Sequence, residues 1–250
     1  MSAASSAPRL ALIGHGRMGR VVESLARERG WPIAAIISGA RDDARGVSGA
    51  GDDARGVGIT PATLNGAQVA IEFTRPEAAA ANVVACVDAG CPIVVGTTGW
   101  LDALPEVTKR VERADGAMLW APNFSLGVAI FLEIVARAST LLARAPGFDA
   151  HLIETHHTAK RDAPSGTALA LRQAAEPLGR DLPITSVRVG HVPGTHTLIA
   201  DAPFEQLRLE HTARDRRAFA EGALVAAQWL IGRRGVFTLR DILNATGADA

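Results

Sequence analysis

The segment of residues 154–167 gathers the side chains best suited to chemistry. Its sequence, ETHHTAKRDAPSGT, places two histidines and a lysine just before a Ser-Gly-Thr helix start. His156 and His157 titrate near neutrality, the range that is useful for proton transfer. Lys160 adds a mobile cation that can donate a proton. We therefore expect acid–base chemistry in this segment, with His156 and Lys160 as its catalytic groups.

The end of the same segment predicts an anion-binding helix N-terminus. Pro164 and Ser165 precede an apolar helical pattern, and serine is a favoured N-cap residue. The first N–H groups, at Gly166 and Thr167, would be free to bind a carboxylate, which the helix dipole also favours. This arrangement predicts a site for a small, carboxylate-bearing molecule beside proton-transfer groups.

The two neighbouring histidines are expected to differ in role. Alternation along a strand puts His156 and His157 on opposite faces. A metal site that combines them with His151 and Glu154 is the alternative. Because adjacent histidines on a strand diverge, and no open carboxylate set supports the site, we expect no metal.

A second motif lies near the start of the chain. G-x-G-x-x-G directly follows the apolar run of residues 9–13 and opens an amphipathic pattern at residues 20–29. In this context its glycines permit a tight turn, close approach of a pyrophosphate, and close packing of the helix on the strand. The motif predicts a dinucleotide site at the helix N-terminus. Its residues are Gly14, His15, Gly16, Arg17, Met18 and Gly19.

The end of the second predicted strand bears on the choice of dinucleotide. An acid is expected there to bind the ribose hydroxyls, but the chain has Ser38. No carboxylate would repel a 2′-phosphate, and Arg41 could pair with one. The sequence therefore predicts that NADPH is used at least as well as NADH.

The first half of the chain alternates short apolar runs with helical patterns, which is typical of a parallel sheet covered on both faces. This predicts an α/β, Rossmann-like dinucleotide-binding domain over residues 1–124. The expected strands are 9–13, 33–37, 69–73, 93–95 and 117–120, and the expected helices are 20–29, 76–89 and 102–114.

The pattern changes after Phe124, where several strands follow one another without intervening helices. This predicts an α+β domain with a mixed sheet over residues 125–234, which would bind substrate. A last helix, 238–243, has no attachment that the pattern reveals. The expected helices are 126–142, 167–178 and 219–231, and the expected strands are 151–157, 184–189, 195–200 and 206–211.

Composition excludes several classes of protein. Lys+Arg and Asp+Glu are both 26, which argues against a general nucleic-acid binder. The longest apolar helical pattern carries Glu133 and Arg137, so no membrane span is expected. Cys86 and Cys91 form no CxxC pair and are expected to be buried. Residues 1–8 lack the features of a secretory signal, so we expect a cytoplasmic protein. The repeated DDARGV of residues 42–47 and 52–57 predicts a mobile surface loop without chemistry.

These motifs together resemble the 4-hydroxy-tetrahydrodipicolinate reductase (dihydrodipicolinate reductase) family of bacterial lysine and diaminopimelate synthesis. The family motif E-x-H-H-x-x-K-x-D-A-P-S-G-T is matched in full by residues 154–167. The resemblance spans about residues 9 to 243. Further matches are GRMG at 16–19, FTRP at 73–76, GTTG at 96–99, APNFS at 121–125, and segments at 188–196 and 235–241.

The resemblance implies a reaction and an assembly. The reaction is reduction of (2S,4S)-4-hydroxy-2,3,4,5-tetrahydrodipicolinate, with loss of water, to tetrahydrodipicolinate by NADPH or NADH. The assembly is a homotetramer formed by the second domain. The C-terminal residues 235–250 would return to the first domain.

The resemblance also implies roles for single residues. His156 matches a proton donor and acceptor, and Lys160 a second proton donor. His157, Gly166 and Thr167 match contacts to the dicarboxylate substrate, and we add Ser165. The implied cofactor contacts, besides the glycine turn, are Phe73, Gly96, Thr97, Thr98, Ala121, Pro122, Asn123 and Phe124.

Two departures from the family pattern concern the cofactor alone. Many members have one more residue in the glycine turn, and many carry an acid or a basic pair near the position of Ser38. The resemblance therefore leaves the choice between NADH and NADPH open.

Two other functions share part of these features. Another two-domain nicotinamide dehydrogenase acting on a small carboxylate would have the glycine turn but should lack the motif of residues 154–167. A non-catalytic module that senses dinucleotide would need neither Lys160 nor the paired histidines. An assay with the dipicolinate precursor and each cofactor separates the three.

Overall fold

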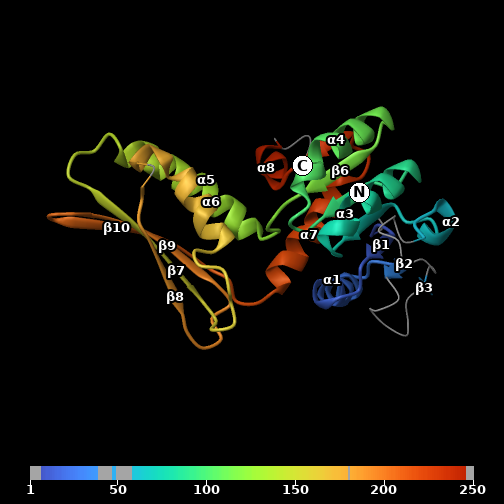
Figure 1. Cartoon of the computed structure of the whole chain (residues 1–250), viewed down its shortest axis with the longest axis horizontal. Helices are drawn as coiled ribbons and strands as arrows, with labels where there is room; N and C mark the ends of the chain where they lie inside the picture. The colour runs from blue at the N-terminus through green and yellow to red at the C-terminus, as the bar shows by residue number, and fades with distance from the viewer. Residues whose placement is uncertain (1–6, 39–46, 49–57, 180, 246–250) are drawn as a thin grey trace, which may run out of the picture. The chain divides into compact units, whose positions relative to one another are not determined.

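The computed structural model describes residues 7–38, 47–48, 58–179 and 181–245. The chain divides into two compact units, one of Met1–Phe124 with Phe219–Ala250 and one of Ser125–Ala218. Figure 1 labels most of their elements. Arg41, and all of the repeated DDARGV segment except Val47, lie outside the described residues.

The first unit contains a parallel sheet. Among the described residues it has seven strands in the order β11-β6-β5-β4-β1-β2-β3, and every neighbouring pair is parallel. This confirms the Rossmann-like prediction. The strands are β1 (Leu10–Ile13), β2 (Ile33–Ser38), β3 (Val47–Ser48), β4 (Val69–Glu72), β5 (Ile93–Val95), β6 (Ala117–Trp120) and β11 (Gly235–Phe237).

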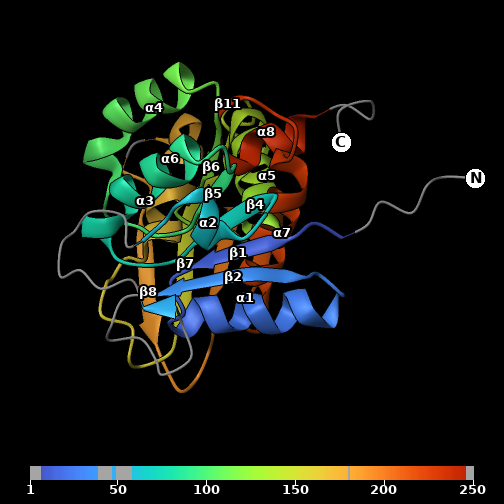
Figure 2. The ribbon, with the colours of Figure 1, turned by 90° about the vertical axis from the view of Figure 1, so that its right-hand side faces the viewer.

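The central strands are apolar because both of their faces are covered. Every residue of β1, β4 and β5 is buried, as expected for a parallel sheet inside an α/β unit. Figure 2 shows α1 running beside β1 and β2. The helices of this unit are α1 (Arg17–Glu28), α2 (Pro61–Leu64), α3 (Pro76–Asp88), α4 (Leu104–Arg113), α7 (Arg217–Leu230) and α8 (Leu239–Asn244), with a 3₁₀ turn, η1 (Leu101–Ala103).

The end of the chain differs from the expected organisation. Helix α7 belongs to the first unit from Phe219 onward, whereas we assigned residues up to 234 to the second domain. Its Glu221 forms an ion pair with Arg29, next to α1, and the Trp229 ring stands edge-on to Phe237 with centroids 5.1 Å apart. We did not expect strand β11, because its sequence, Gly-Val-Phe, has only two apolar residues. It adds to the sheet beside β6.

The second unit is a four-stranded mixed sheet with helices on one face, which confirms the predicted α+β class. The order is β10-β9-β7-β8; β7 and β8 are parallel and the other pairs are antiparallel. Leu152 and Leu198 of the sheet pack with Phe131, Val135 and Leu171 of the helices. The elements are α5 (Leu126–Leu142), β7 (Asp149–His156), α6 (Gly166–Ala174), η2 (Glu176–Leu178), β8 (Ile184–Arg188), β9 (Thr195–Ala202) and β10 (Glu205–Thr212).

Two simpler expectations can be compared with the structure. None of the helices in the described ranges has the length and apolar character needed to cross a membrane. Cys86 and Cys91 are free and buried, as predicted.

Candidate active site

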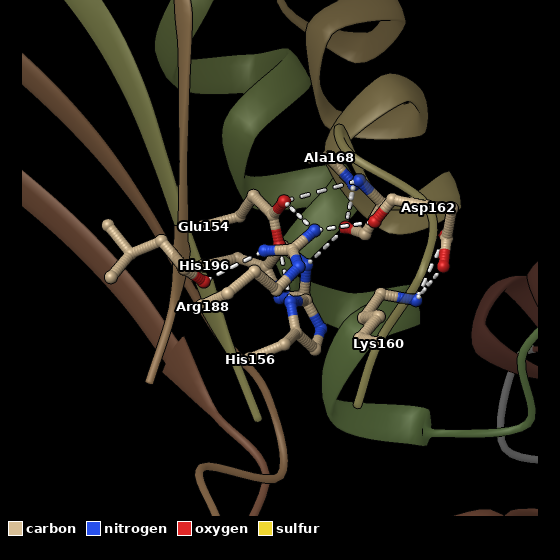
Figure 3. Close-up of polar contacts among 9 residues, drawn as sticks. Glu154, His156, Lys160, Asp162, Ala168, Arg188 and His196 are labelled. Atoms are coloured by element: carbon tan, nitrogen blue, oxygen red, sulfur yellow. Dashed lines mark hydrogen bonds and ion pairs between the residues drawn. The ribbon is translucent and has the colours of Figure 1, made fainter. Parts of the chain in front are cut away.

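Three strands of the second unit bring four polar side chains together. Strand pairing sets His156 of β7 opposite Arg188 of β8, and Glu154 of β7 opposite His196 of β9. Glu154 and His156 are two residues apart, so their side chains share one face of the sheet. Figure 3 shows the resulting cluster, with side chains that converge from all three strands.

The Glu154 carboxylate is the centre of this cluster. Its side chain is 1% exposed and forms hydrogen bonds within β7, with β8 and with the start of α6. Oε2 bonds Nδ1 of His156. Oε1 accepts from Nη2 of Arg188 at 2.7 Å and from the backbone N–H of Ser165 at 3.3 Å. The carboxylate thus connects two strands to the start of α6.

The Glu154 carboxylate is ionised at neutral pH. Burial alone would raise its pKa, but hydrogen bonds from Arg188 and Ser186 and the charge of His156 lower the pKa to about 2. An ionised carboxylate can only accept hydrogen bonds, so Nδ1 of His156 must be the donor.

His156 is buried, and its surroundings favour the uncharged form of the ring. Burial lowers its pKa, and Glu154 offsets only part of that effect; the positive charges of Lys160 and Arg188 lower the pKa further. Within the described chain its other ring nitrogen, Nε2, has no hydrogen-bond partner. The ring is therefore oriented through one nitrogen and available through the other.

His196 is a second, deeper imidazole. Its ring lies edge-on to that of His156, with centroids 5.1 Å apart, and its Nε2 is 3.1 Å from Oγ of Ser165. Burial, followed by the charge of His156, lowers the pKa of His196 to about 4. Nδ1 of His196 is buried and lacks a partner among the described residues. This histidine is neutral at physiological pH.

The predicted helix N-terminus is present. Ser165 is the N-cap residue of α6, and its Oγ accepts from the N–H of Ala168 at 3.2 Å. The first amides are not all free, however. Ser165 N–H donates to Glu154, and the N–H of Gly166 hydrogen-bonds the Asp162 carboxylate. Our expectation of an open amide at Gly166 is therefore wrong for this conformation, in which the Asp162 carboxylate occupies the place of an anion.

The other predicted groups lie in the same segment but outside the cluster. Nζ of Lys160 contacts both carboxylate oxygens of Asp162, at 2.8 and 2.9 Å. Figure 3 shows this pair on the loop that leads to α6. His157 follows the last residue of β7, and its ring takes part in none of the hydrogen bonds of the cluster.

A metal ion would find three ligands here. One ligand atom from each of Glu154, His156 and His196 lies within 4.8 Å of the other two. The Arg188 guanidinium already pairs with this carboxylate, and its charge would oppose a cation. The alternative set with His151 is not assembled, because that ring instead bonds Oγ1 of Thr185.

Sequence reasoning missed Arg188 and His196. Both fall in segments that match the family pattern, but neither received a role. The missing information was register: Arg188 is 34 residues from the carboxylate that it binds, and only strand pairing brings the two together.

The glycine turn of the first unit fits a dinucleotide. A Cβ on Gly14, whose φ is +91°, would lie 2.3 Å from the Phe73 carbonyl oxygen, and one on Gly19 would lie 2.2 Å from the Gly14 carbonyl oxygen. Packing therefore requires both glycines. Above Gly16, no atom of the described residues outside its own turn lies within 4 Å of such a Cβ. This open space at the α1 N-terminus suits a pyrophosphate.

The start of α1 is also suitable for an anion. Gly16 is its N-cap residue, no side chain caps it, and its first turn has no acidic residue. Arg17 is exposed. The His15 ring, in contrast, is 2.6 Å from Oε2 of Glu23 on the same helix.

The remaining predicted cofactor residues follow adjacent strands. Phe73 follows β4, residues 96–98 follow β5, and residues 121–124 follow β6. These strands lie in the order β6-β5-β4-β1 in a parallel sheet, so their turns lie along the same edge as the glycine turn. Oγ1 of Thr97 accepts from the N–H of Thr74 at 2.7 Å. Ser38 ends β2 and is buried.

Comparison with known proteins identifies the family. The family model "Dihydrodipicolinate reductase, N-terminus" matches residues 8–124, and "Dihydrodipicolinate reductase, C-terminus" matches residues 127–243. A 4-hydroxy-tetrahydrodipicolinate reductase of Christiangramia forsetii is 33% identical, over 94% of this chain and 97% of the relative. One of Thiobacillus denitrificans is 38% identical, over 94% and 98%.

A solved structure has the same fold. Dipicolinate-bound dihydrodipicolinate reductase from Paenisporosarcina sp. TG-14 aligns with a TM-score of 0.76 at 19% identity, and covers 94% of this chain and 99% of that one. With matches to both halves and relatives over nearly its full length, the chain belongs to the dihydrodipicolinate reductase family.

Proposed function

We propose that this chain reduces 4-hydroxy-tetrahydrodipicolinate to tetrahydrodipicolinate, with loss of water and with a nicotinamide dinucleotide as hydride donor. The observation that carries the proposal is the Glu154–His156 pair. Glu154 orients the imidazole of His156 and also accepts from the N–H of Ser165, the N-cap residue of α6, all within the segment that resembles the family motif. The first unit would bind the dinucleotide and the second the substrate.

Substrate binding uses charge. A carboxylate of the substrate would replace the Asp162 carboxylate at Lys160 and at the first N–H groups of α6, with Gly166 and Thr167 contributing amides and His157 a further contact. The Lys160–Asp162 pair suits such an exchange, because the Asp162 side chain is 58% exposed and exposed ion pairs stabilise by only about 0–1 kcal/mol.

Proton transfer follows from the same charges. Without substrate, His156 is mostly neutral, because its pKa is lowered. Two substrate carboxylates nearby would raise that pKa again, since an opposite charge favours the protonated form. His156 would thus become a proton donor when the site is filled, with Lys160 as the second donor. The cofactor supplies the hydride.

For the cofactor, the proposed contacts are the glycine turn and the turns after β4, β5 and β6. Buried Ser38 replaces the acid that binds ribose hydroxyls in NAD-specific sites. The proposed preference is therefore NADPH at least as strongly as NADH, with Arg41 as a partner for the 2′-phosphate.

Self-association is proposed for the open face of the second sheet. The helices pack on one face, while Ile153, Val187 and Ile199 on the other face are only partly covered, and Phe204 between β9 and β10 is fully exposed. A homotetramer, as the family resemblance implies, would bury such side chains.

The proposed location is the cytoplasm, which agrees with the two free cysteines. No nucleic-acid partner is proposed, because the formal net charge of the chain is zero.

The test is turnover by the purified full chain. Freshly prepared 4-hydroxy-tetrahydrodipicolinate is supplied with NADPH or NADH, and loss of the reduced nicotinamide is followed by absorbance. We expect oxidation that depends on substrate, with kcat/KM for NADPH equal to or above that for NADH. Oxidation with other small carboxylates but not with this substrate would identify a different dehydrogenase. Nucleotide binding without turnover would identify a sensor.

A further inference from the structure

One carboxylate holds both functional parts of the site in the second unit. Oε2 of Glu154 bonds the His156 ring, and Oε1 accepts from the N–H of Ser165, which caps α6. Any rotation of this side chain would disturb the imidazole and the helix N-terminus together. Glu154 is therefore placed to control their mutual arrangement.

The Arg188 guanidinium keeps the carboxylate in place. Its Nη2 donates to Oε1 of Glu154 at 2.7 Å and to the carbonyl oxygen of Asp162 at 2.5 Å, while Nη1 donates to the carbonyl oxygen of Val187 at 2.8 Å. Figure 3 shows the guanidinium between Glu154 and the loop that carries Asp162. A planar fork bonded on both sides leaves little freedom for the group that it binds.

The ring of His156 is asymmetric as a result. Because Glu154 accepts at Nδ1, the neutral ring carries its hydrogen there and its lone pair at Nε2. On that side lies Gly194, with φ +154°; a Cβ at this position would be 3.0 Å from Nε2. The absence of a side chain at residue 194 leaves Nε2 uncrowded.

We propose that Glu154, held by Arg188, is a positioning residue that keeps Nδ1 of His156 protonated and reserves Nε2 for proton exchange with the substrate. The assignment of the proton's destination rests on the function proposed above. The tautomer of the ring rests on the contacts of Glu154 with His156 and Arg188.

The proton balance is simple. The imidazolium of His156 transfers its Nε2 proton to the carbon of the substrate next to the one that receives the hydride. The ring is then neutral and keeps its Nδ1 hydrogen on Glu154. The Glu154 carboxylate never takes up the proton, and solvent returns one to Nε2 before the next turnover.

The first test reads the tautomer directly, without any reaction. The full chain is labelled with ¹⁵N-histidine, and two-bond ¹H–¹⁵N correlation spectra are recorded above the pKa of His156. Loss of one signal set in His156→Gln assigns this ring among the seven histidines. We expect the Nδ1–H form. A neutral His156 with its hydrogen on Nε2 overturns the inference.

The second test perturbs the carboxylate. Glu154→Gln keeps one acceptor oxygen, which Arg188 and Ser165 N–H both require, and replaces the oxygen facing Nδ1 of His156 by an NH₂ donor. We expect kcat to fall by about 10²–10⁴-fold. The KM for the nucleotide should stay within about two-fold, because the turns of the first unit are untouched. The His156 tautomer should change in the same variant. Arg188→Lys, which keeps the charge but loses the fork, should lower kcat less.

Glu205→Gln is the matched control, since Glu205 is an exposed glutamate at the start of β10 in the same unit. It should change neither kcat nor the spectrum. If Glu154→Gln keeps the wild-type tautomer and kcat, the inference is wrong. If the wild type shows the Nδ1–H form but no turnover, the proposed function fails and the positioning role of Glu154 stands.

Discussion

Each unit of the protein buries one glutamate near the end of a central strand, and the two glutamates have opposite environments. Glu72 ends β4 in the first unit and is fully buried. It bonds the hydroxyl and the N–H of Thr74, and its Oε2 has no partner among the described residues. Burial raises the pKa of Glu72 more than its hydrogen bonds lower it. Glu154 is as deeply buried but ionised.

The two carboxylates have different partners. Glu154 has a guanidinium and an imidazole beside it, whereas Glu72 has only hydroxyls, an amide from Asn82 and a backbone N–H. Hydroxyl and amide neighbours do not offset the burial of Glu72, whereas the guanidinium beside Glu154 helps to keep that carboxylate charged. A charged carboxylate orients the ring in the second unit, while the less ionised Glu72 supports the turn after β4.

The largest effect should come from removing the cation beside Glu154. Arg188→Met leaves a buried carboxylate without its counter-ion, which typically costs about 3–5 kcal/mol of unfolding free energy. Urea unfolding at neutral pH measures this. Arg208→Met is the control, because Arg208 pairs with Glu210 on the surface and its loss should cost about 1 kcal/mol or less. If Arg188→Met and Arg208→Met lose the same unfolding free energy, burial of the carboxylate does not raise the cost of removing its cation.

The next largest effect should appear in the pH dependence of the unfolding free energy, through Glu154. Glu154 has a folded pKa of about 2 against 4.5 unfolded, so its contribution is present above pH 4.5 and is lost as the pH falls toward 2. Linkage makes this contribution roughly 3 kcal/mol at neutral pH. Unfolding free energies measured between pH 6 and 3 should fall less steeply in Glu154→Gln. An unchanged slope would mean that Glu154 is not ionised in the folded state.

Glu72 should behave in the opposite way. Its folded pKa is raised above 4.5, so its contribution to stability is present at low pH and is lost as the pH rises through the folded value. Glu72→Gln removes this cost at neutral pH, and we expect an unfolding free energy equal to the wild-type value or higher by up to about 1 kcal/mol. An unfolding free energy clearly below the wild-type value would show that Glu72 is held as an anion.

A third carboxylate, that of Asp162, extends the comparison to the surface. Its contacts with Lys160 and with the N–H of Gly166 are exposed. Asp162→Asn should leave stability within about 0.5 kcal/mol of wild type. The KM for substrate should fall by about two- to five-fold, because an internal competitor is lost. Steady-state kinetics measure this, and a raised KM would instead make Asp162 part of the binding site.

The strands and most helices could be predicted because apolar periodicity specifies them locally. The exceptions have physical causes. Strand β11 has only two apolar residues in the sequence Gly-Val-Phe. The helix expected at residues 219–231 is present as α7, but its own pattern does not reveal that it packs in the first unit. In the site, residues 154–167 revealed His156, Lys160 and the helix N-terminus because they are contiguous. Arg188 and His196 depend on strand register, and the binding of Gly166 to Asp162 depends on loop geometry that no pattern encodes.

The place of β11 in the sheet has a consequence for how the polypeptide matures on the ribosome. The second unit is one continuous stretch, but the first is completed only by residues from 219 onward. While the chain is still being synthesised, β6 remains an open edge until β11 emerges and pairs with it. A nascent chain that stalls after residue 218 would therefore carry a finished second unit beside an incomplete nucleotide fold, exposed to proteases and to mispairing.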